Sequence, residues 1–131
     1  MRVVVDTNVF ISSFLGGYPK RVIDLWKTGK VTLCLTNAII DEYIGVLKRM
    51  EFIRNEDIKA LLFLFKEQFN CVFSASVSPL SVCSDPDDDK FIEAAVALDA
   101  EVIISGDDHL KSMKKYMDIR IMPPKDFVKR F

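Results

Sequence analysis

Short apolar segments alternate with longer segments of helical period along this chain. Val3-Val4-Val5 is apolar without alternation, which is typical of a strand buried on both faces of a parallel sheet. Similar apolar runs predict strands at 31–35, 71–73 and 101–105, and a last, edge-type strand at 118–122. The alternation predicts an α/β fold, with a mainly parallel sheet of four to five strands and helices on both faces.

The expected helices start and end at recognisable residues. Gly16-Gly17 ends the first helix, which Thr7 and Asn8 are expected to help cap. The third and fourth helices are expected to pack together as a hairpin. The expected helices are 8–15, 19–27, 37–50 and 55–69, then one from Asp85 onward, a short basic helix or loop at 111–116, and one from Pro123 onward.

Two acids follow predicted strands directly. Asp6 comes after Val5, and Asp107 comes after the run that ends in Ser105. Right-handed crossovers bring the carboxyl ends of parallel strands to one edge of the sheet, where open α/β sheets bind their ligands. We therefore expect Asp6 and Asp107 to lie close together.

A third acid, Glu42, is expected on the apolar side of the helix at 37–50. It stands three residues after Ile39 and four before Val46, whereas Asp41 points elsewhere. Because an unpaired carboxylate is costly to bury, Glu42 is either part of a site or a partly buried acid paired with lysine or arginine. Its candidacy depends on Asp6, since without Asp6 the paired acid is the preferred interpretation.

The segment 85–91 adds four acids. Asp85 followed by Pro86 is typical of a helix N-cap and first helical residue, and acids in a first turn suit the helix dipole. These structural roles explain two or three of the four. Helix register distinguishes Asp88 from Asp89: it predicts Asp88 on the core-facing side of the helix and Asp89 on the solvent-facing side.

Length and charge limit the function classes. The 131 residues predict one domain, 1–131, and the net charge of −1 excludes a polycation. No apolar run approaches the roughly 20 residues of a membrane helix and no leader precedes Val3, so the expected location is the cytoplasm. Segment 85–108 has nine acids and one lysine, whereas 111–131 has seven basic residues and two acids. This asymmetry suits a metal site beside a surface for an anionic polymer, although solvated surface charge explains charge alone more simply.

Four carboxylates at one edge of a sheet need a compensating charge. Oxygen ligands select Mg²⁺ or Mn²⁺ over zinc, and such an ion activates water for attack on a phosphodiester. The chain has no Gly-rich phosphate loop and no serine–histidine or cysteine–histidine pairing that would indicate a covalent catalyst. His109, the only histidine, is interpreted as incidental rather than catalytic.

In its strand runs and in the acids that follow them, the chain resembles the PIN-domain ribonucleases, and in particular the relatives of the VapC toxins of toxin–antitoxin pairs. The similarity runs in family order over nearly the whole chain. It rests on Val3-Val4-Val5-Asp6-Thr7-Asn8, Glu42-Tyr43, Asp85-Pro86-Asp87-Asp88 with Phe91 and Ala95, and Ile103-Ile104-Ser105-Gly106-Asp107. The family more often has threonine at the position of Ser105, where this chain keeps the hydroxyl.

The resemblance implies a three-layer α/β/α domain that cleaves RNA endonucleolytically with Mg²⁺ or Mn²⁺, as the toxin of a toxin–antitoxin pair. It also implies a cognate antitoxin and a homodimer. The metal-binding and catalytic acids would be Asp6, Glu42, Asp88 and Asp107, with Asp85 at the edge of the site and Asn8 and Ser105 orienting the acids and water.

Three alternatives stay open. A receiver-like signalling module also gathers acids at strand ends, but it carries an acid pair after its first strand, where this chain has Asp6 followed by Thr7-Asn8. A nuclease that has lost its activity and serves as a scaffold is disfavoured because all four acids are present. An RNA-processing nuclease without an antitoxin has the same residues as a toxin.

Overall fold

A six-stranded sheet, in the order β3-β2-β1-β4-β6-β5, forms the centre of the computed structural model, which describes all 131 residues. Its strands are β1 (Arg2–Val5), β2 (Thr32–Thr36), β3 (Cys71–Ser74), β4 (Val102–Ile104), β5 (Lys115–Tyr116) and β6 (Ile119–Met122). All neighbouring strands are parallel except β5 and β6. The sheet has one strand more than the largest number expected, because the two-residue β5 pairs with β6. The edge-type strand expected at 118–122 is therefore an interior strand.

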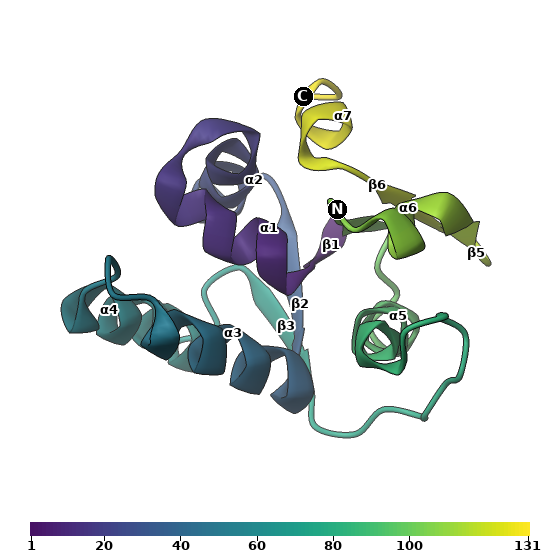
Figure 1. The fold of residues 1–131 in the computed structure, drawn as a ribbon, viewed down its shortest axis with the longest axis horizontal. Helices are drawn as coiled ribbons and strands as arrows, with labels where there is room; N and C mark the ends of the chain where they lie inside the picture. The colour runs from purple at the N-terminus through teal and green to yellow at the C-terminus, as the bar shows by residue number, and fades with distance from the viewer.

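Helices cover both faces of the sheet. They are α1 (Thr7–Ser12), α2 (Gly17–Lys27), α3 (Asn37–Arg49), α4 (Asn55–Lys66), α5 (Asp89–Ala97), α6 (Asp108–Met113) and α7 (Pro124–Val128), with 3₁₀ turns η1 (Ser13–Leu15) and η2 (Pro86–Asp88). None of these helices combines the length and the apolar character needed to cross a membrane. In Figure 1, α1, α2 and α7 lie on one side of the sheet and α5 on the other, while α3 and α4 run side by side. The three-layer α/β/α fold and the helical hairpin are as expected.

The core explains why the first strand reads as an unbroken apolar run. Val3, Val4 and Val5 are at most 1% exposed, because helices pack on both faces of β1. The hydroxyl of Tyr43 on α3 donates a hydrogen bond to the carbonyl of Val5. The Tyr43 ring also stacks on Phe10 of α1, with 4.1 Å between ring centroids. These contacts hold α1 and α3 over the carboxyl end of β1.

The position of β1 creates a crevice at this end of the sheet. It pairs with β2 on one side and with β4 on the other, in register Val3↔Val102 and Val5↔Ile104 on the β4 side. The chain leaves β1 toward β2 and returns to the sheet at β4, so the connections diverge at the carboxyl ends of β1 and β4. Open α/β sheets bind ligands at such switch points. The residues that follow β1 and β4 therefore define the candidate site.

Candidate functional site

An acidic cavity of about 250 Å³ opens at this crevice. Acids make up six of its ten lining residues, which is far above the charged share of the chain as a whole. The lining residues are Asp6, Thr7, Asn8, Glu42, Val46, Asp85, Asp87, Asp88, Phe91 and Asp107. The structure thus brings together Asp6, Glu42, Asp85, Asp88, Asp107 and Asn8, all of which the sequence nominates; Ser105 lies directly behind them.

Asp6 is fixed by the backbone of α1 and by Ser105. One of its oxygens accepts a hydrogen bond from the backbone N–H of Val9 at 2.8 Å, and the other accepts one from the Ser105 hydroxyl. Asp6 is therefore the N-cap of α1, whereas the sequence assigned that role to Thr7 and Asn8. The helix starts one residue earlier than expected because the first side chain after the strand already caps it.

Ser105 connects the two acids that follow the central strands. It is completely buried, and its hydroxyl accepts a hydrogen bond from the backbone N–H of Asp107 at 3.0 Å while donating to Asp6. Asp107 caps α6 through one oxygen, which accepts from the N–H groups of His109 and Leu110. The second oxygen of Asp107 remains free for a ligand.

Burial raises the pKa of Asp6 above its ordinary value. Hydrogen bonds from Ser105 and from the Val9 N–H oppose this shift, because they favour the ionised form. The negative charges of Asp107 and Glu42 add to it. Asp6 is thus a carboxylate with charged neighbours on two sides and only 3% of its surface exposed.

Glu42 reaches the cavity from α3, and both of its oxygens have partners. The Thr7 hydroxyl donates to Oε2, and the Lys90 ammonium on α5 forms an ion pair with Oε1 at 2.7 Å. The sequence left two interpretations open for this residue, a member of the site or an acid paired with a base. Both describe the structure, since Glu42 lines the cavity and is paired with Lys90.

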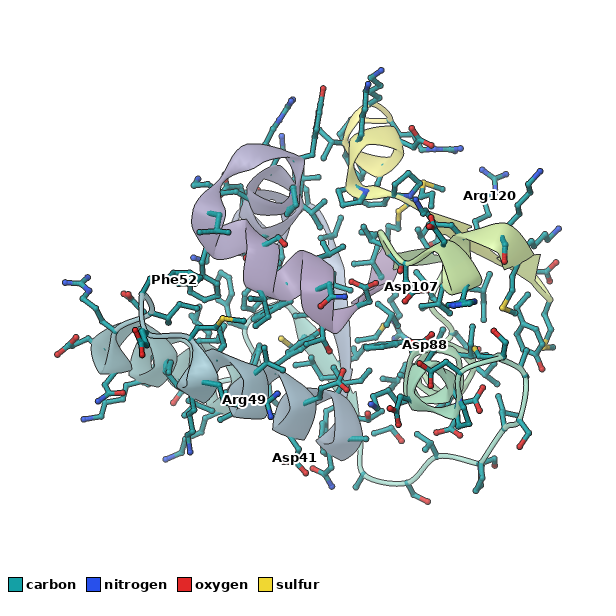
Figure 2. The ribbon with its side chains drawn as sticks, viewed as in Figure 1. Asp41, Arg49, Phe52, Asp88, Asp107 and Arg120 are labelled. Atoms are coloured by element: carbon teal, nitrogen blue, oxygen red, sulfur yellow. The ribbon has the colours of Figure 1, made fainter.

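Asp85 and Asp88 come from the turn that leads into α5. Asp85 caps η2 by accepting from the N–H of Asp87 at 3.0 Å, as expected for an acid before Pro86. Asp88 makes no capping hydrogen bond, and its Oδ2 is buried without any hydrogen-bond partner. Figure 2 shows Asp88 and Asp107 close together, while Asp41 lies apart on α3.

The unpartnered Asp88 has a pKa raised to about 6 from an ordinary value of 3.8. Desolvation is the largest cause, followed by the negative charges of Asp107, Asp85 and Asp6. A buried carboxylate oxygen without a donor is unusual in a folded protein, and it is the kind of atom that a bound cation or water satisfies.

The interpretation of Asp89 from helix register is wrong. Asp89 is only 7% exposed, and its Oδ1 accepts hydrogen bonds from the backbone N–H groups of Val82 at 3.1 Å and Cys83 at 2.8 Å. These bonds lower its pKa, the Cys83 bond being the largest cause. The prediction failed because the side chain turns back to tie down the preceding loop. The helical period cannot report such a contact.

The donor chemistry of the cavity fits a hard divalent cation. All candidate ligands are carboxylate oxygens, neighbouring negative charges raise the pKa of Asp6 and of Asp88, and Asp88 Oδ2 and one Asp107 oxygen have no protein donor. The arrangement is nevertheless open, because no three His, Cys, Asp or Glu side chains are positioned to hold a metal ion as they stand. Metal binding at this site would require the carboxylates to rotate toward a common point.

The sequence did not predict the contacts that two polar residues make with Glu42. Thr7 donates to Glu42, and Lys90 pairs with it. Lys90 carried a usable signal, since it is the one lysine among nine acids in segment 85–108. The role of Thr7 depends on the distance between α1 and α3, which the sequence does not contain.

The surroundings of the cavity contribute little else. His109 contacts the Ser84 hydroxyl at 3.3 Å and does not line the cavity, although its charge opposes that of the acids in setting the pKa of Asp88. A larger cavity of about 360 Å³ lies between α5 and β6, lined in part by Ala95, Glu101 and Ile119. It contains none of the predicted site residues and no comparable convergence of acids.

Comparisons with known proteins bear on this geometry. A family model described as the PIN domain matches residues 2–109. The uncharacterized protein MJ1680 of Methanocaldococcus jannaschii is 33% identical, over 100% of this chain and 92% of the relative.

Two solved structures are similar in fold at low sequence identity. One is a chain of VapBC2 from Rickettsia felis, bound to a DNA fragment from their promoter, with a TM-score of 0.57 and 13% identity over 92% of this chain and 97% of that one. The other is the PIN domain of human SMG5, with a TM-score of 0.57 and 15% identity over 99% of this chain and 98% of that one. At these identities the likeness concerns the fold alone.

Proposed function

The chain belongs to the PIN domain family, and on that basis we propose that it is a Mg²⁺- or Mn²⁺-dependent endoribonuclease. The observation that carries the proposal is the convergence of Asp6, Glu42, Asp88 and Asp107 in one cavity, with Asp88 Oδ2 buried and unpartnered. The other sizeable cavities of the molecule contain neither Asp6 nor Asp107.

Asp6, Glu42, Asp88 and Asp107 are the proposed ligands of the ion, with Asp85 supporting them from the edge of the cavity. An ion bound there supplies charge compensation and a bound water of lowered pKa. Ser105 keeps Asp6 and Asp107 in a fixed relation, because its hydroxyl bonds to both. Asn8 lines the cavity and is exposed, so its amide is available to orient water or a phosphate oxygen.

The proposed reaction is hydrolysis of an RNA phosphodiester. Water attacks phosphorus, the bond from phosphorus to the 3′ oxygen breaks, and the leaving oxygen takes up a proton. The products are a 5′-phosphate and a 3′-hydroxyl. In this proposal the acids fix the geometry and the charge of the site, and water rather than a side chain is the nucleophile.

The RNA partner is supported by the basic end of the chain. Residues 111–131 include seven basic residues and two acids, and they begin four residues after Asp107 in the sequence. Lys114, Lys115 and Arg120 are exposed, in the segment that runs from the end of α6 through β5 to β6. In Figure 2, Arg120 projects from this side of the molecule. Lysine and arginine side chains placed in this way neutralise backbone phosphates.

The proposed biological role is the toxin of a toxin–antitoxin pair. A chain of VapBC2 from Rickettsia felis has a similar fold, and so does the PIN domain of human SMG5, so the fold fits this role without selecting it over routine RNA processing. A cognate antitoxin would bind the chain and block the acidic cavity. The homodimer is supported by exposed apolar side chains on and near α4, namely Leu62, Phe63, Phe69 and Phe73.

The test of the enzymatic proposal is cleavage of a labelled RNA with Mn²⁺, followed by mapping of the product ends. Wild type is expected to yield 5′-phosphate ends, and Asp6→Asn and Asp107→Asn are expected to be inactive with intact folds. Asparagine keeps an oxygen that accepts from the Val9 N–H or from the His109 N–H, so the helix caps survive. Cleavage that persists in both variants after repurification, or in excess EDTA, would overturn the assignment.

The toxin role has a separate test. Expression of wild type is expected to arrest bacterial growth, whereas Asp107→Asn is expected to be harmless at the same protein level. Co-expression of a neighbouring short reading frame should restore growth if it encodes the antitoxin. Active enzyme that is harmless when expressed would favour an RNA-processing nuclease.

A further inference from the structure

The ion pair between Lys90 and Glu42 joins two helices that approach the cavity from different sides. Lys90 Nζ lies 2.7 Å from Glu42 Oε1, and the side chains are only 20% and 31% exposed. The other ion pairs of the molecule join residues three or four positions apart in the sequence. The Lys90–Glu42 pair is therefore the one ion pair that depends on the tertiary fold.

This ion pair occupies an oxygen that the proposed function assigns to a metal ion. Lys90 takes Oε1 of Glu42, and the Thr7 hydroxyl takes Oε2. Asp88, by contrast, has an oxygen without any partner, and Asp107 uses only one oxygen in capping α6. The four acids are thus unequally available for a cation, and Glu42 is the least available.

The charge balance of the cavity gives the lysine a second effect. Six acids line the cavity, and Lys90 is the only base that forms an ion pair with any of them. A fixed ammonium group beside Glu42 offsets part of the repulsion between the acids when no metal is bound. The same group repels an incoming divalent cation and holds one of its ligands.

We propose that Lys90 is a built-in cation of the acidic cavity, a positioning residue that competes with the divalent ion for the Glu42 carboxylate. It lets the metal-free protein fold with its acids gathered, at the expense of metal affinity. This inference rests on the proposed metal site, but it does not depend on RNA being the substrate. Lys90 touches neither substrate nor ion in this role and acts through Glu42.

The experiment is Mn²⁺ titration calorimetry on the full chain at low ionic strength, with wild type, Lys90→Met and Lys90→Arg. Lys90→Met is expected to lower the dissociation constant for Mn²⁺ by at least about tenfold, because a competing charge a few ångströms away is removed. Lys90→Arg keeps the charge and is expected to bind like wild type. The control is Lys20→Met, which removes an equal charge from the exposed Lys20–Asp24 pair on α2 and should leave the affinity unchanged.

Two further measurements separate competition from other roles. In a Glu42→Gln background, Lys90→Met should tighten binding much less, since the contested carboxylate is absent. Thermal unfolding in EDTA should show Lys90→Met to be less stable than wild type, with a larger gain on adding Mn²⁺. A loss of stability that Mn²⁺ does not repair would indicate a packing role and would contradict the proposal.

The inference is overturned if folded Lys90→Met binds Mn²⁺ no more tightly than wild type. It is also overturned if Lys90→Met tightens Mn²⁺ binding equally in the wild-type and Glu42→Gln backgrounds. RNA cleavage by the same preparations reports on the proposed function separately. If the variants show the predicted Mn²⁺ affinities but no preparation cleaves RNA, the role of Lys90 stands and the ribonuclease proposal is rejected. If RNA is cleaved but the affinities differ from those predicted, the ribonuclease proposal stands and the role of Lys90 is rejected. A wild-type chain that binds no Mn²⁺ would reject both proposals.

Discussion

The hydroxyl of Ser105, at the end of β4, donates a hydrogen bond to the carboxylate of Asp6, at the end of β1. Both side chains are buried, Ser105 completely and Asp6 to all but 3% of its surface. The bond joins the two central strands at the point where the chain reverses its direction through the sheet. The candidate site is therefore built on the buried central strands of the sheet.

Replacing Ser105 tests this relationship. Ser105→Ala is expected to lower the free energy of unfolding by about 1–3 kcal/mol, because it leaves an Asp6 oxygen buried without a donor. Ser105→Thr keeps the hydroxyl and should retain RNA cleavage, at a cost of up to about 1–3 kcal/mol for an added methyl group in a filled site. Urea unfolding at pH 7 measures both. Unchanged stability in Ser105→Ala would mean that the bond is not a stabilising one.

The raised pKa of Asp88 predicts an unusual pH dependence for the metal-free protein. The carboxyl group titrates near pH 6 in the folded chain, against 3.8 for its ordinary value. Its favourable contribution is therefore present below about pH 4 and is lost as the pH rises through 6. Asp88→Asn should stabilise the metal-free protein by about 1–2 kcal/mol at pH 7.5, allowing for solvent screening, and by nothing near pH 3.5.

Urea unfolding of both proteins in EDTA at the two pH values provides the measurement. Adding Mn²⁺ at pH 7.5 is the control, because wild type should then gain stability and Asp88→Asn should gain less. Equal metal-free stability of the two proteins at pH 7.5 would contradict the raised pKa of Asp88.

Adjacent acids on α3 provide a matched pair for activity. Glu42 lines the cavity, whereas Asp41 is exposed and lies apart from it. Glu42→Gln is expected to reduce Mn²⁺-dependent RNA cleavage by at least about tenfold, because it alters an acid at the metal site. Asp41→Asn removes the same charge and should cleave like wild type. Equal losses in the two variants would point to a general effect of charge instead of a site.

Asp89 is expected to matter for stability through the loop that it holds. Asp89→Ala leaves the N–H groups of Val82 and Cys83 without their acceptor and should lower the free energy of unfolding by about 1–3 kcal/mol. Asp89→Asn keeps an oxygen acceptor and should lose less. Because the pKa of Asp89 is lowered in the folded chain, its contribution is present above the ordinary value of 3.8 and is lost as the pH falls. Urea unfolding at pH 7 and pH 3 checks the order of the variants.

Asp88 and Asp89 show which side-chain positions can be predicted from the sequence and which cannot. The strand runs, the acids that follow them and the core-facing position of Asp88 depend on local periodicity, which a sequence displays directly. The burial of Asp89 depends on the loop before α5, which has no period, and on a 3₁₀ turn that shifts the helix start to Asp89. Periodicity therefore identifies the elements and several of the acids, but it gives no account of side chains that bind irregular backbone.

Lys90 illustrates a second limit. Its contact with Glu42 joins residues 48 positions apart, through the packing of α3 and α5. A lone base among acids predicts that some ion pair forms, but the partner is chosen by helix positions that only the structure gives. The same holds for Thr7, which reaches Glu42 because α1 and α3 are packed together through Phe10 and Tyr43.

The most direct test of the central claim is Mn²⁺ titration calorimetry on wild type and Asp6→Asn, coupled to RNA cleavage by the same preparations. The account predicts that wild type binds Mn²⁺ and cleaves RNA only with the metal, and that Asp6→Asn is folded but does neither. Absence of Mn²⁺ binding by folded wild type would contradict it. The acids at the carboxyl ends of β1 and β4 would then be helix caps and surface charge only.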